Sequence, residues 1–350
     1  MGLIFRLHKT ILCLMAGCSP FCASAQYPDL VAIADQADPA YIQTYDSLLT
    51  GRYYFSRKYT SIHLGGDKSV ANLRYRPNTT LNMGVGATYR NFTLNLAYGF
   101  PFLNPEKGKG KTRYLDLQSH IYTRNWTIDF FGQFYKGYFL NPKGLGNNNS
   151  QAYYLRPDLG ISLFGLAVYN LRNGERFSYR AAFLQSEWQK KSAGTFLFGG
   201  EIYAGSVSGD SVLVPSLLAD RYDQREVKRI RFLELGPGAG YAYTLVLKKH
   251  WFMTGAATLN MDFGLSREFY GDRSSDKITL SPNFIYRGVV GYNSNTWNLN
   301  FSLVGNTILV KGASSKNDYQ FNTGNYRLTL AKRFNPGTKL KRKLKWLDPK

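Results

Sequence analysis

The feature that most constrains the fold of this chain is an alternation of apolar and polar residues at every second position. The clearest case is the segment 79–90, where five apolar residues alternate with polar residues or glycine. The segment 92–100 repeats the pattern, and only Arg90-Asn91 lie between the last apolar residue of the first segment, Tyr89, and the first of the second, Phe92. Alternation over about ten residues between turns is typical of transmembrane β-barrels, whose strands place one face on lipid and the other on the lumen. A tight hairpin is therefore expected at Arg90-Asn91.

Membrane insertion, if it occurs, must use strands. After residue 25 no stretch approaches the roughly 18 consecutive apolar residues that a spanning helix needs. Aromatic residues make up 15% of the chain, and there are 34 glycines, a composition that favours strands over helices. We predict an all-β fold, an antiparallel transmembrane β-barrel of about twelve strands. The predicted strands are 79–90, 92–100, 115–121, 126–130, 153–171, 176–187, 193–207, 230–247, 251–265, 277–292, 296–310 and 319–334.

The strand number has a range of about 10 to 14. The segments 53–64 and 71–76 also read as strands and would raise the total to about fourteen. Short turns are expected at 172–174, 248–249 and 293–295, on the periplasmic side, and long polar loops at 104–111 and 141–151. The long segment 209–229 breaks the alternation of short and long connections. One strand near it has therefore been missed or wrongly added.

The start of the chain resembles a cleaved signal peptide, residues 1–25. Arg6 and Lys9 precede a short apolar core, and Ala23-Ser24-Ala25 resembles a cleavage site. The three cysteines lie before this site, so a mature protein without cysteine, disulfides or thiolate chemistry is expected. A rival interpretation is a lipoprotein signal, because Met15-Ala16-Gly17-Cys18 resembles a lipobox and would make Cys18 the acylated first residue.

Three further regions follow from the pattern. Residues 26–51 are expected to form an N-terminal periplasmic segment, with a possible short helix at 39–49 that lies in the periplasm or plugs the barrel. Residues 52–334 are expected to form the barrel. Residues 335–350 form a basic tail with six Lys and Arg residues, which either attaches to an anionic surface or is simply solvated.

The formal net charge of +21 suggests an anionic partner. The basic residues are spread along the whole chain, and no zinc spacing, helix-turn-helix pattern or RNA-binding motif accompanies them. Nucleic acid is therefore not expected as a partner. The expected partners are outer-membrane lipid and lipopolysaccharide, with the barrel-assembly machinery during biogenesis, and the oligomeric state is open.

Several segments carry a resemblance to a known family. They are Tyr75-Arg76-Pro77-Asn78-Thr79, Gln133-Phe134-Tyr135-Lys136-Gly137-Tyr138, 177–200, 240–250 and Asn322-Thr323-Gly324-Asn325-Tyr326. They resemble the domain-of-unknown-function 4421 family of Gram-negative envelope proteins and span most of the mature chain. The resemblance implies an outer-membrane β-barrel. It brings no catalytic or binding residues.

Alternation assigns a set of polar side chains to the lumen, because a charge facing lipid near the midplane would cost about 2 to 4 kcal/mol. A narrow barrel packs such groups into an ion-pair and hydrogen-bond network, and a wide one lines a water channel with them. About twelve strands leave limited space, which favours the packed network. The predicted lumen residues are Arg90, Asp116, His120, Asp129, Arg156, Asp158, Arg180, Glu234, Asp262 and Arg327.

His120 is the one candidate catalytic residue, and a weak one. Ser119 precedes it and Asp116 lies nearby, but adjacent residues of a strand point to opposite faces, so Ser119 cannot serve His120 directly. A lumen histidine in a polar network is the simpler interpretation. Gly236, Gly238 and Gly240 are followed by strand and not by a helix, which argues against a phosphate-binding loop. No cofactor and no metal site is expected.

Three functions remain open from the sequence. The first is a non-enzymatic outer-membrane barrel, either a small-solute channel or an envelope scaffold. The second is an outer-membrane lipid-modifying enzyme of the acyl hydrolase type, suggested by the basic loops and His120. The third is a soluble periplasmic binding protein with an unclosed β-sandwich, since alternation also fits antiparallel sheets in water.

Overall fold

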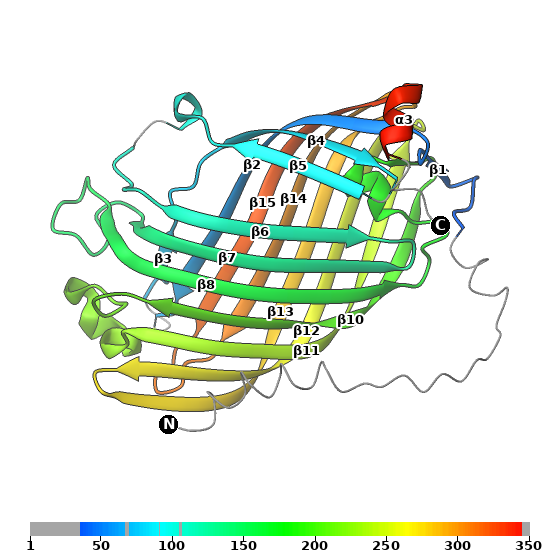
Figure 1. Ribbon diagram of the computed structural model, residues 1–350. Coiled ribbons are helices and arrows are strands. Elements are labelled where there is room, and N and C mark those ends of the chain that lie inside the picture. Colours follow the sequence, from blue (N-terminus) through cyan, green and yellow to red (C-terminus); the bar gives the residue numbers. More distant parts are fainter. Residues whose placement is uncertain (1–35, 67–69, 91, 105–106, 345–350) are drawn as a thin grey trace. The chain divides into compact units, whose positions relative to one another are not determined.

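One antiparallel sheet dominates the structure (Figure 1). The computed structural model describes residues 36–66, 70–90, 92–104 and 107–344. The all-β class is confirmed, and the 13 strands of the sheet fall within the predicted range. They are β2 (Leu49–Leu64), β3 (Leu73–Arg76), β4 (Asn82–Tyr89), β5 (Phe92–Tyr98), β6 (Arg113–Tyr122), β7 (Trp126–Asn141), β8 (Tyr154–Leu171), β10 (Ala193–Ser208), β11 (Arg229–Leu247), β12 (Trp251–Tyr270), β13 (Arg273–Asn293), β14 (Trp297–Val310) and β15 (Tyr319–Phe334).

The sheet closes on itself because its last strand pairs with its first. β15 and β2 are antiparallel over their whole lengths, from Tyr319 opposite Leu64 to Phe334 opposite Leu49. A closed ring runs through β2, β3, β7, β8 and then β10 to β15. Closure removes the sheet edges from this ring, as membrane barrels require. The chain is therefore a barrel and not the unclosed sandwich of the third hypothesis.

The wall between β2 and β7 is built differently from the rest. At one end the short strand β3 bridges the two, pairing with residues 62–64 of β2 and 139–141 of β7. Toward the other end, β4 pairs with residues 49–56 of β2 and carries β5, while β6 pairs with β7. Three strands thus occupy the part of the wall that β3 does not reach.

The two ends of the barrel differ in their connections. We call one the loop end, because the segments 65–72, 99–112, 142–153, 209–228 and 311–318 all join strands there. We call the other the turn end, where short turns such as 123–125, 248–250 and 294–296 join strands. The turns predicted at 248–249 and 293–295 and the loops predicted at 104–111 and 141–151 are confirmed.

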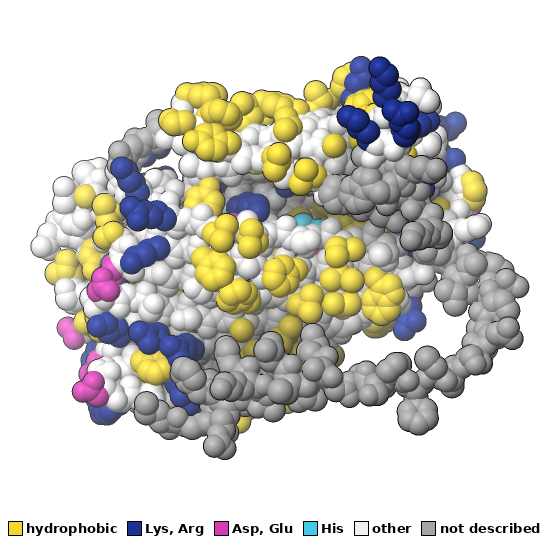
Figure 2. Space-filling model, in the orientation of Figure 1, with side chains coloured by type: hydrophobic (Ala, Val, Ile, Leu, Met, Phe, Trp, Pro, Cys, Tyr) yellow, Lys and Arg dark blue, Asp and Glu magenta, His cyan; other side chains and the backbone are white. Residues whose placement is uncertain are grey.

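Burial alternates along the strands. On β12, every second side chain from Trp251 to Leu265 faces outward, and most of these are large and apolar. Figure 2 shows such apolar side chains in bands over the outer wall. Inside, aromatic and aliphatic side chains of the loop-end half form a hydrophobic core, which includes Tyr75, Tyr203 and Phe321. The outer belt is the lipid-facing surface expected of a membrane barrel.

Two local predictions were wrong. The segment 176–187 is not a strand: it contains a π-helical turn, η2 (Arg180–Leu184), before the short strand β9 (Glu187–Gln189). The segment 39–49 is not a helix, because it contains β1 (Ile42–Thr44), which pairs with β9. Removing the false strand restores the alternation of connections, since β8 and β10 then meet at the turn end and 209–228 lies at the loop end.

The basic tail contains the seven-residue helix α3 (Thr338–Leu344), which carries Lys341, Arg342 and Lys343 in its last turn. Within the described residues, no helix has both the length and the apolar character to cross a membrane. The predicted signal peptide, residues 1–25, lies outside the described residues.

Candidate functional site

The first group of predicted lumen residues centres on Asp116 of β6. Its carboxylate lies 3.3 Å from Lys58 Nζ, which reaches across from β2, and the same ammonium donates to the Asp116 carbonyl at 3.0 Å. The other carboxylate oxygen accepts hydrogen bonds from Gln133 at 3.2 Å and Tyr135 at 2.5 Å. Asp116 is therefore part of a packed polar network, as the sequence predicts for a narrow barrel.

His120 and Asp129 face each other on adjacent strands. His120 Nδ1 lies 2.6 Å from Asp129 Oδ1, and the fully buried Asp129 also forms an ion pair with Arg287 of β13. Arg287 in turn donates to the Tyr122 hydroxyl at 2.9 Å. Because Arg287 already neutralises Asp129, the arrangement is a structural ion pair that spans the lumen, with His120 as its third member.

Arg156 and Asp158 lie at the loop end of β8. Their side chains form a bidentate pair, with distances of 2.9 and 2.8 Å. Arg156 also donates to the carbonyls of Val212 and Ser211, and the Asp158 carboxylate accepts the backbone N–H of Asp210. The pair therefore fastens the connection between β10 and β11 over the barrel mouth.

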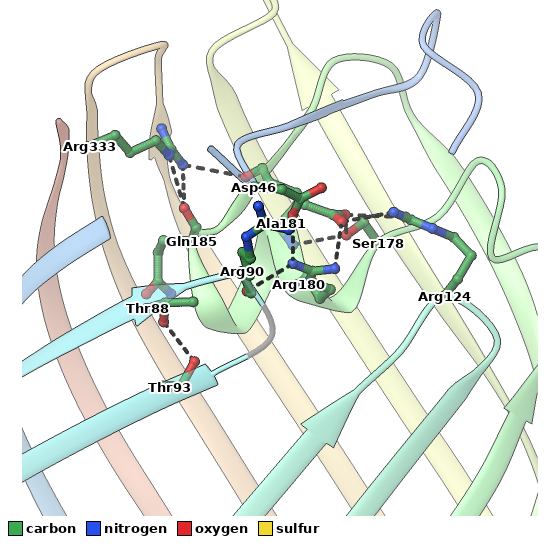
Figure 3. Close-up of polar contacts among 11 residues, drawn as sticks. Asp46, Thr88, Arg90, Thr93, Arg124, Ser178, Arg180, Ala181, Gln185 and Arg333 are labelled. Atoms are coloured by element: carbon green, nitrogen blue, oxygen red, sulfur yellow. Dashed lines mark hydrogen bonds and ion pairs between the residues drawn. The ribbon is translucent and has the colours of Figure 1, made fainter. Parts of the chain in front are cut away.

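The connection between β8 and β10 folds into the turn end and plugs it (Figure 3). Glu187 of this plug, residues 172–192, is fully buried and accepts hydrogen bonds from Arg124 at 2.8 and 3.2 Å and from Ser178. The predicted lumen residue Arg180 belongs to the plug as well, and lies 3.5 Å from Glu187 and 3.2 Å from Asp46. Arg90 was predicted on the polar face of a strand, but it lies in the β4–β5 turn, where its carbonyl accepts from Arg180.

Two wall arginines complete the attachment of the plug. Arg333 of β15 donates to the carbonyl of Gln185 at 3.0 and 2.7 Å. Arg52 of β2 donates to the carbonyl of Leu184 at 2.5 Å and to Thr88 at 2.6 Å. Neither was predicted. Their guanidinium groups donate hydrogen bonds to plug carbonyls, and buried carbonyls need such donors.

The remaining predicted residues lie on the wall. Glu234 and Asp262 are buried on β11 and β12, and Asn283 donates to Asp262 at 2.7 Å. Arg327 of β15 lies with its guanidinium 4.5 Å from the centre of the Tyr54 ring. The small residues on β11 make room for lumen side chains, because a Cβ at Gly238 would lie 1.7 Å from Asn260 Oδ1. No phosphate-binding loop forms there, since 236–240 is strand.

Two interior cavities of the described residues are very small. A cavity lined by Tyr169, Tyr179 and Arg287 holds about 10 Å³, and one beside Ala182 and Phe252 holds essentially none. Within the described part of the chain, no three His, Cys, Asp or Glu side chains are grouped to hold a metal ion. These two interior cavities are too small to bind a ligand.

A cavity of about 590 Å³ lies on the outer wall near the loop end. Alternation on β2 turns Arg57, Tyr59, Ser61 and His63 outward, away from the lumen residues Lys58, Thr60 and Ile62. Arg74 and Arg76 of β3 also point outward. The β5–β6 loop, with Lys109, covers the cavity from one side. We call this cavity the outer groove; its lining includes Arg57, Tyr59, His63, Arg74, Arg76, Thr79, Lys109, Phe139, Tyr286 and Tyr326.

The floor of the outer groove depends on two glycines. Tyr286, Gly305, Gly324 and Tyr59 stand side by side on β13, β14, β15 and β2. A Cβ at Gly305 would lie 2.4 Å from the Tyr286 ring, and one at Gly324 would lie 2.6 Å from the Tyr59 hydroxyl. Both rings therefore lie flat against the wall, and Tyr59 also stacks on Tyr326 at 5.6 Å.

The outer groove is strongly basic. Among the described residues, no carboxylate lies within 4.0 Å of a charged nitrogen of Arg57, Arg74, Arg76 or Lys109. Partial burial lowers the pKa of Lys109, and the nearby cations Arg57, Lys107, Arg76 and Lys143 lower it further. A cluster of unneutralised cations beside aromatic rings is the arrangement that binds an anionic group.

The sequence indicates which face of the sheet the arginines of this groove occupy. The segments 53–64 and 71–76 read as strands, and alternation places Arg57, Arg74 and Arg76 on the face opposite Tyr75. What the sequence could not provide is the pairing of β2 with β3, which brings these side chains together.

The solved structures to which this chain is similar include outer-membrane proteins. The outer membrane protease OmpT from Escherichia coli is 8% identical, with a TM-score of 0.36, over 83% of this chain and 98% of that one. The outer membrane channel COG4313 from Pseudomonas putida F1 is 10% identical, with a TM-score of 0.23, over 85% and 100%. No curated protein matches. Residues 36–334 match the family model described as Domain of unknown function (DUF4421).

Proposed function

The chain belongs to the DUF4421 family of unknown function, and we propose that it is a closed, plugged outer-membrane barrel that binds lipopolysaccharide in its outer groove. The loop end then faces the cell exterior, because bacterial barrels have long external loops and short periplasmic turns. The observation that carries the proposal is the set of four cations without carboxylate partners in a cavity of about 590 Å³ on the wall.

The height of the outer groove fits a lipid headgroup. On β15 the outward side chains Leu330, Leu328 and Tyr326 are exposed and apolar or aromatic, and Asn322 and Gln320 follow toward the loop end. Tyr326 pairs in register with Arg57. The cations therefore begin where the apolar belt ends, with tyrosines at the boundary, as expected at the membrane interface.

The packed interior argues against the small-solute channel. The loop-end half is filled by a hydrophobic core, the middle by ion pairs, and the turn end by the plug. No steady current in planar bilayers is expected from the purified protein, and a sustained conductance would contradict a plugged barrel.

The lipid-modifying enzyme is a second candidate because His120 and Asp129 form a close pair and the His120 side chain is 22% exposed. Within the described residues, no serine hydroxyl is hydrogen-bonded to His120. Replacing His120 with alanine is expected to leave the lipid composition of the membrane unchanged. An altered composition would favour the enzyme instead.

Lipid binding is tested with the double variant Arg74→Gln/Arg76→Gln. Both side chains are exposed, so folding is expected to survive. The measurement is the lipopolysaccharide retained per barrel after purification in mild detergent, quantified by mass spectrometry. Each cation near an anionic lipid surface contributes about 1 kcal/mol, so the loss of two should weaken binding roughly thirtyfold.

A matched control is available on β11. Arg229 and Arg231 are also two residues apart, exposed and near the loop end, and both guanidinium groups contact the Phe269 ring. The Arg229→Gln/Arg231→Gln variant is expected to retain lipopolysaccharide like the unmodified protein. Equal retention by both double variants would overturn the proposal.

A further inference from the structure

Among the described residues, strands β5 and β6 each leave one edge unpaired. β5 pairs with β4 and β6 pairs with β7, but β5 and β6 do not pair with each other, although they are consecutive in the chain. We call the opening between residues 92–98 and 113–122 the seam. It lies in the part of the wall that β3 does not close.

The seam exposes the lumen. The lumen-facing residues Gln118 and His120 of β6 are only partly buried, whereas Asp129 and Phe131 of the neighbouring β7 are buried. The lumen-facing Lys58 side chain is also 21% exposed. Figure 2 shows a hollow between the apolar bands of β5 and β6 in which basic and histidine side chains are visible.

The rims of the seam lie in the lipid-facing belt. Leu94 and Leu96 are exposed on the outer face of β5, and Leu115, Leu117 and Ile121 are exposed on that of β6. Unpaired backbone N–H and C=O groups cannot remain against hydrocarbon, because each costs several kcal/mol there. A polar occupant is therefore required. A single added strand would be antiparallel to only one of the two edges, since β5 and β6 run in opposite directions.

The charge behind the seam favours an anion. Arg52 donates to Asn95 of β5 at 3.3 Å, so its guanidinium lies next to the seam. Arg327 approaches the ring of Tyr54, which follows Arg52 on the same face of β2. Neither arginine has a carboxylate within 4.0 Å among the described residues, and the Nε of each is buried without a hydrogen-bond partner. A buried cation of this kind requires a counter-charge.

We propose that the seam binds an anionic phospholipid of the periplasmic leaflet. Its phosphate contacts Arg52 and Arg327, and its acyl chains lie against the apolar rims. The seam lies toward the turn end, which faces the periplasm in the proposed orientation. The headgroup of a lipid in the periplasmic leaflet is therefore on the same side of the bilayer as the two arginines. This site is separate from the outer groove and does not depend on lipopolysaccharide binding there.

The test is native mass spectrometry of the purified full chain in detergent with phosphatidylglycerol, with zwitterionic phosphatidylcholine, or with soluble glycerol phosphate. The variants are Arg327→Gln, which removes a cation, and Gln118→Trp, which fills the seam from its lumen side. Each is expected to reduce bound phosphatidylglycerol at least tenfold. Gly255→Trp is the control, because Gly255 faces outward on β12 with no atom within 4 Å of an added Cβ.

The outcomes separate the alternatives. Two results together support the proposal. The unmodified protein retains phosphatidylglycerol but not phosphatidylcholine. Both seam variants lose phosphatidylglycerol, whereas Gly255→Trp and Arg74→Gln/Arg76→Gln keep it. Equal retention of the two lipids, or unchanged binding in the seam variants, overturns it. Equal binding of glycerol phosphate would show a soluble anion site, and a polypeptide retained in the seam would show strand addition; either result also overturns it.

Discussion

Glu187 and Arg124 form a buried bidentate ion pair between the plug and the β6–β7 turn, with distances of 2.8 and 3.2 Å. The plug has little regular structure of its own, so its position depends on such contacts. Arg180 also forms an ion pair with the Glu187 carboxylate, and the Ser178 hydroxyl donates a hydrogen bond to it. The pair is therefore one of the contacts that hold the plug in the turn end.

We expect Glu187→Gln to loosen the plug while the wall stays intact. Removing one partner of a buried pair leaves the other charge uncompensated, at a cost of about 3 to 5 kcal/mol. Limited proteolysis and hydrogen exchange of residues 172–192 should both accelerate. Glu175→Gln, in the same segment but exposed, is the control, and equal protection in the two variants would count against this role of Glu187.

Arg287→Met should destabilise the barrel as a whole. The substitution leaves Asp129 buried beside His120 without its main counter-charge, which is expected to cost about 3 to 5 kcal/mol. The temperature at which the unboiled protein loses its compact migration on a denaturing gel measures the effect. The double variant Arg287→Met/Asp129→Leu removes both charges and should recover much of the loss; no recovery would show that packing, not charge, dominates at this position.

Gly324→Ala should disturb the outer groove. The added methyl would lie 2.6 Å from the Tyr59 hydroxyl and 2.8 Å from the Val304 carbonyl. Overpacking of this kind typically costs about 1 to 3 kcal/mol, and displacement of the Tyr59 ring should also reduce lipopolysaccharide retention. In Gly288→Ala nothing lies within 4 Å of the new Cβ, so neither stability nor lipopolysaccharide retention should change. Similar effects of the two variants would refute the role of the Tyr59 ring.

Removing the plug should not open a channel. Replacing residues 178–189 with a short Gly-Ser linker leaves the loop-end core intact, including the fully buried Phe321, whose ring lies 4.6 Å from that of Phe232. The shortened protein is therefore expected to remain non-conducting in planar bilayers. Stable current steps would mean that the plug is the only barrier and that the loop-end core is permeable.

Much of the wall could be predicted because alternation is a local property. The hairpin at Arg90, the long strands and the lumen position of Asp116 and His120 all follow from it. The segment 176–187 shows where the argument fails: its alternating residues pack against the inside of the barrel, where Phe177 and Tyr179 are buried among lumen side chains. A plug and a strand both need spaced apolar residues, and the sequence alone does not distinguish them.

The functional surfaces were harder to predict because they depend on which strands meet. Arg57 and Arg74 are 17 positions apart in the sequence. The pairing of β3 with β2 brings them into one groove. The seam is likewise invisible in the sequence, since β5 and β6 look like an ordinary consecutive pair. Alternation identifies the face of a residue but not its neighbours across the sheet.

The short bridge β3 also gives the wall unequal perimeters. At the loop end the circuit passes from β2 through β3 to β7, whereas toward the turn end it passes through β4, β5 and β6. Each strand occupies about 4.8 Å of perimeter, so the second route is longer by roughly 10 Å even before the seam is counted. The barrel is thus a wedge in the bilayer, and it displaces more lipid from one leaflet than from the other.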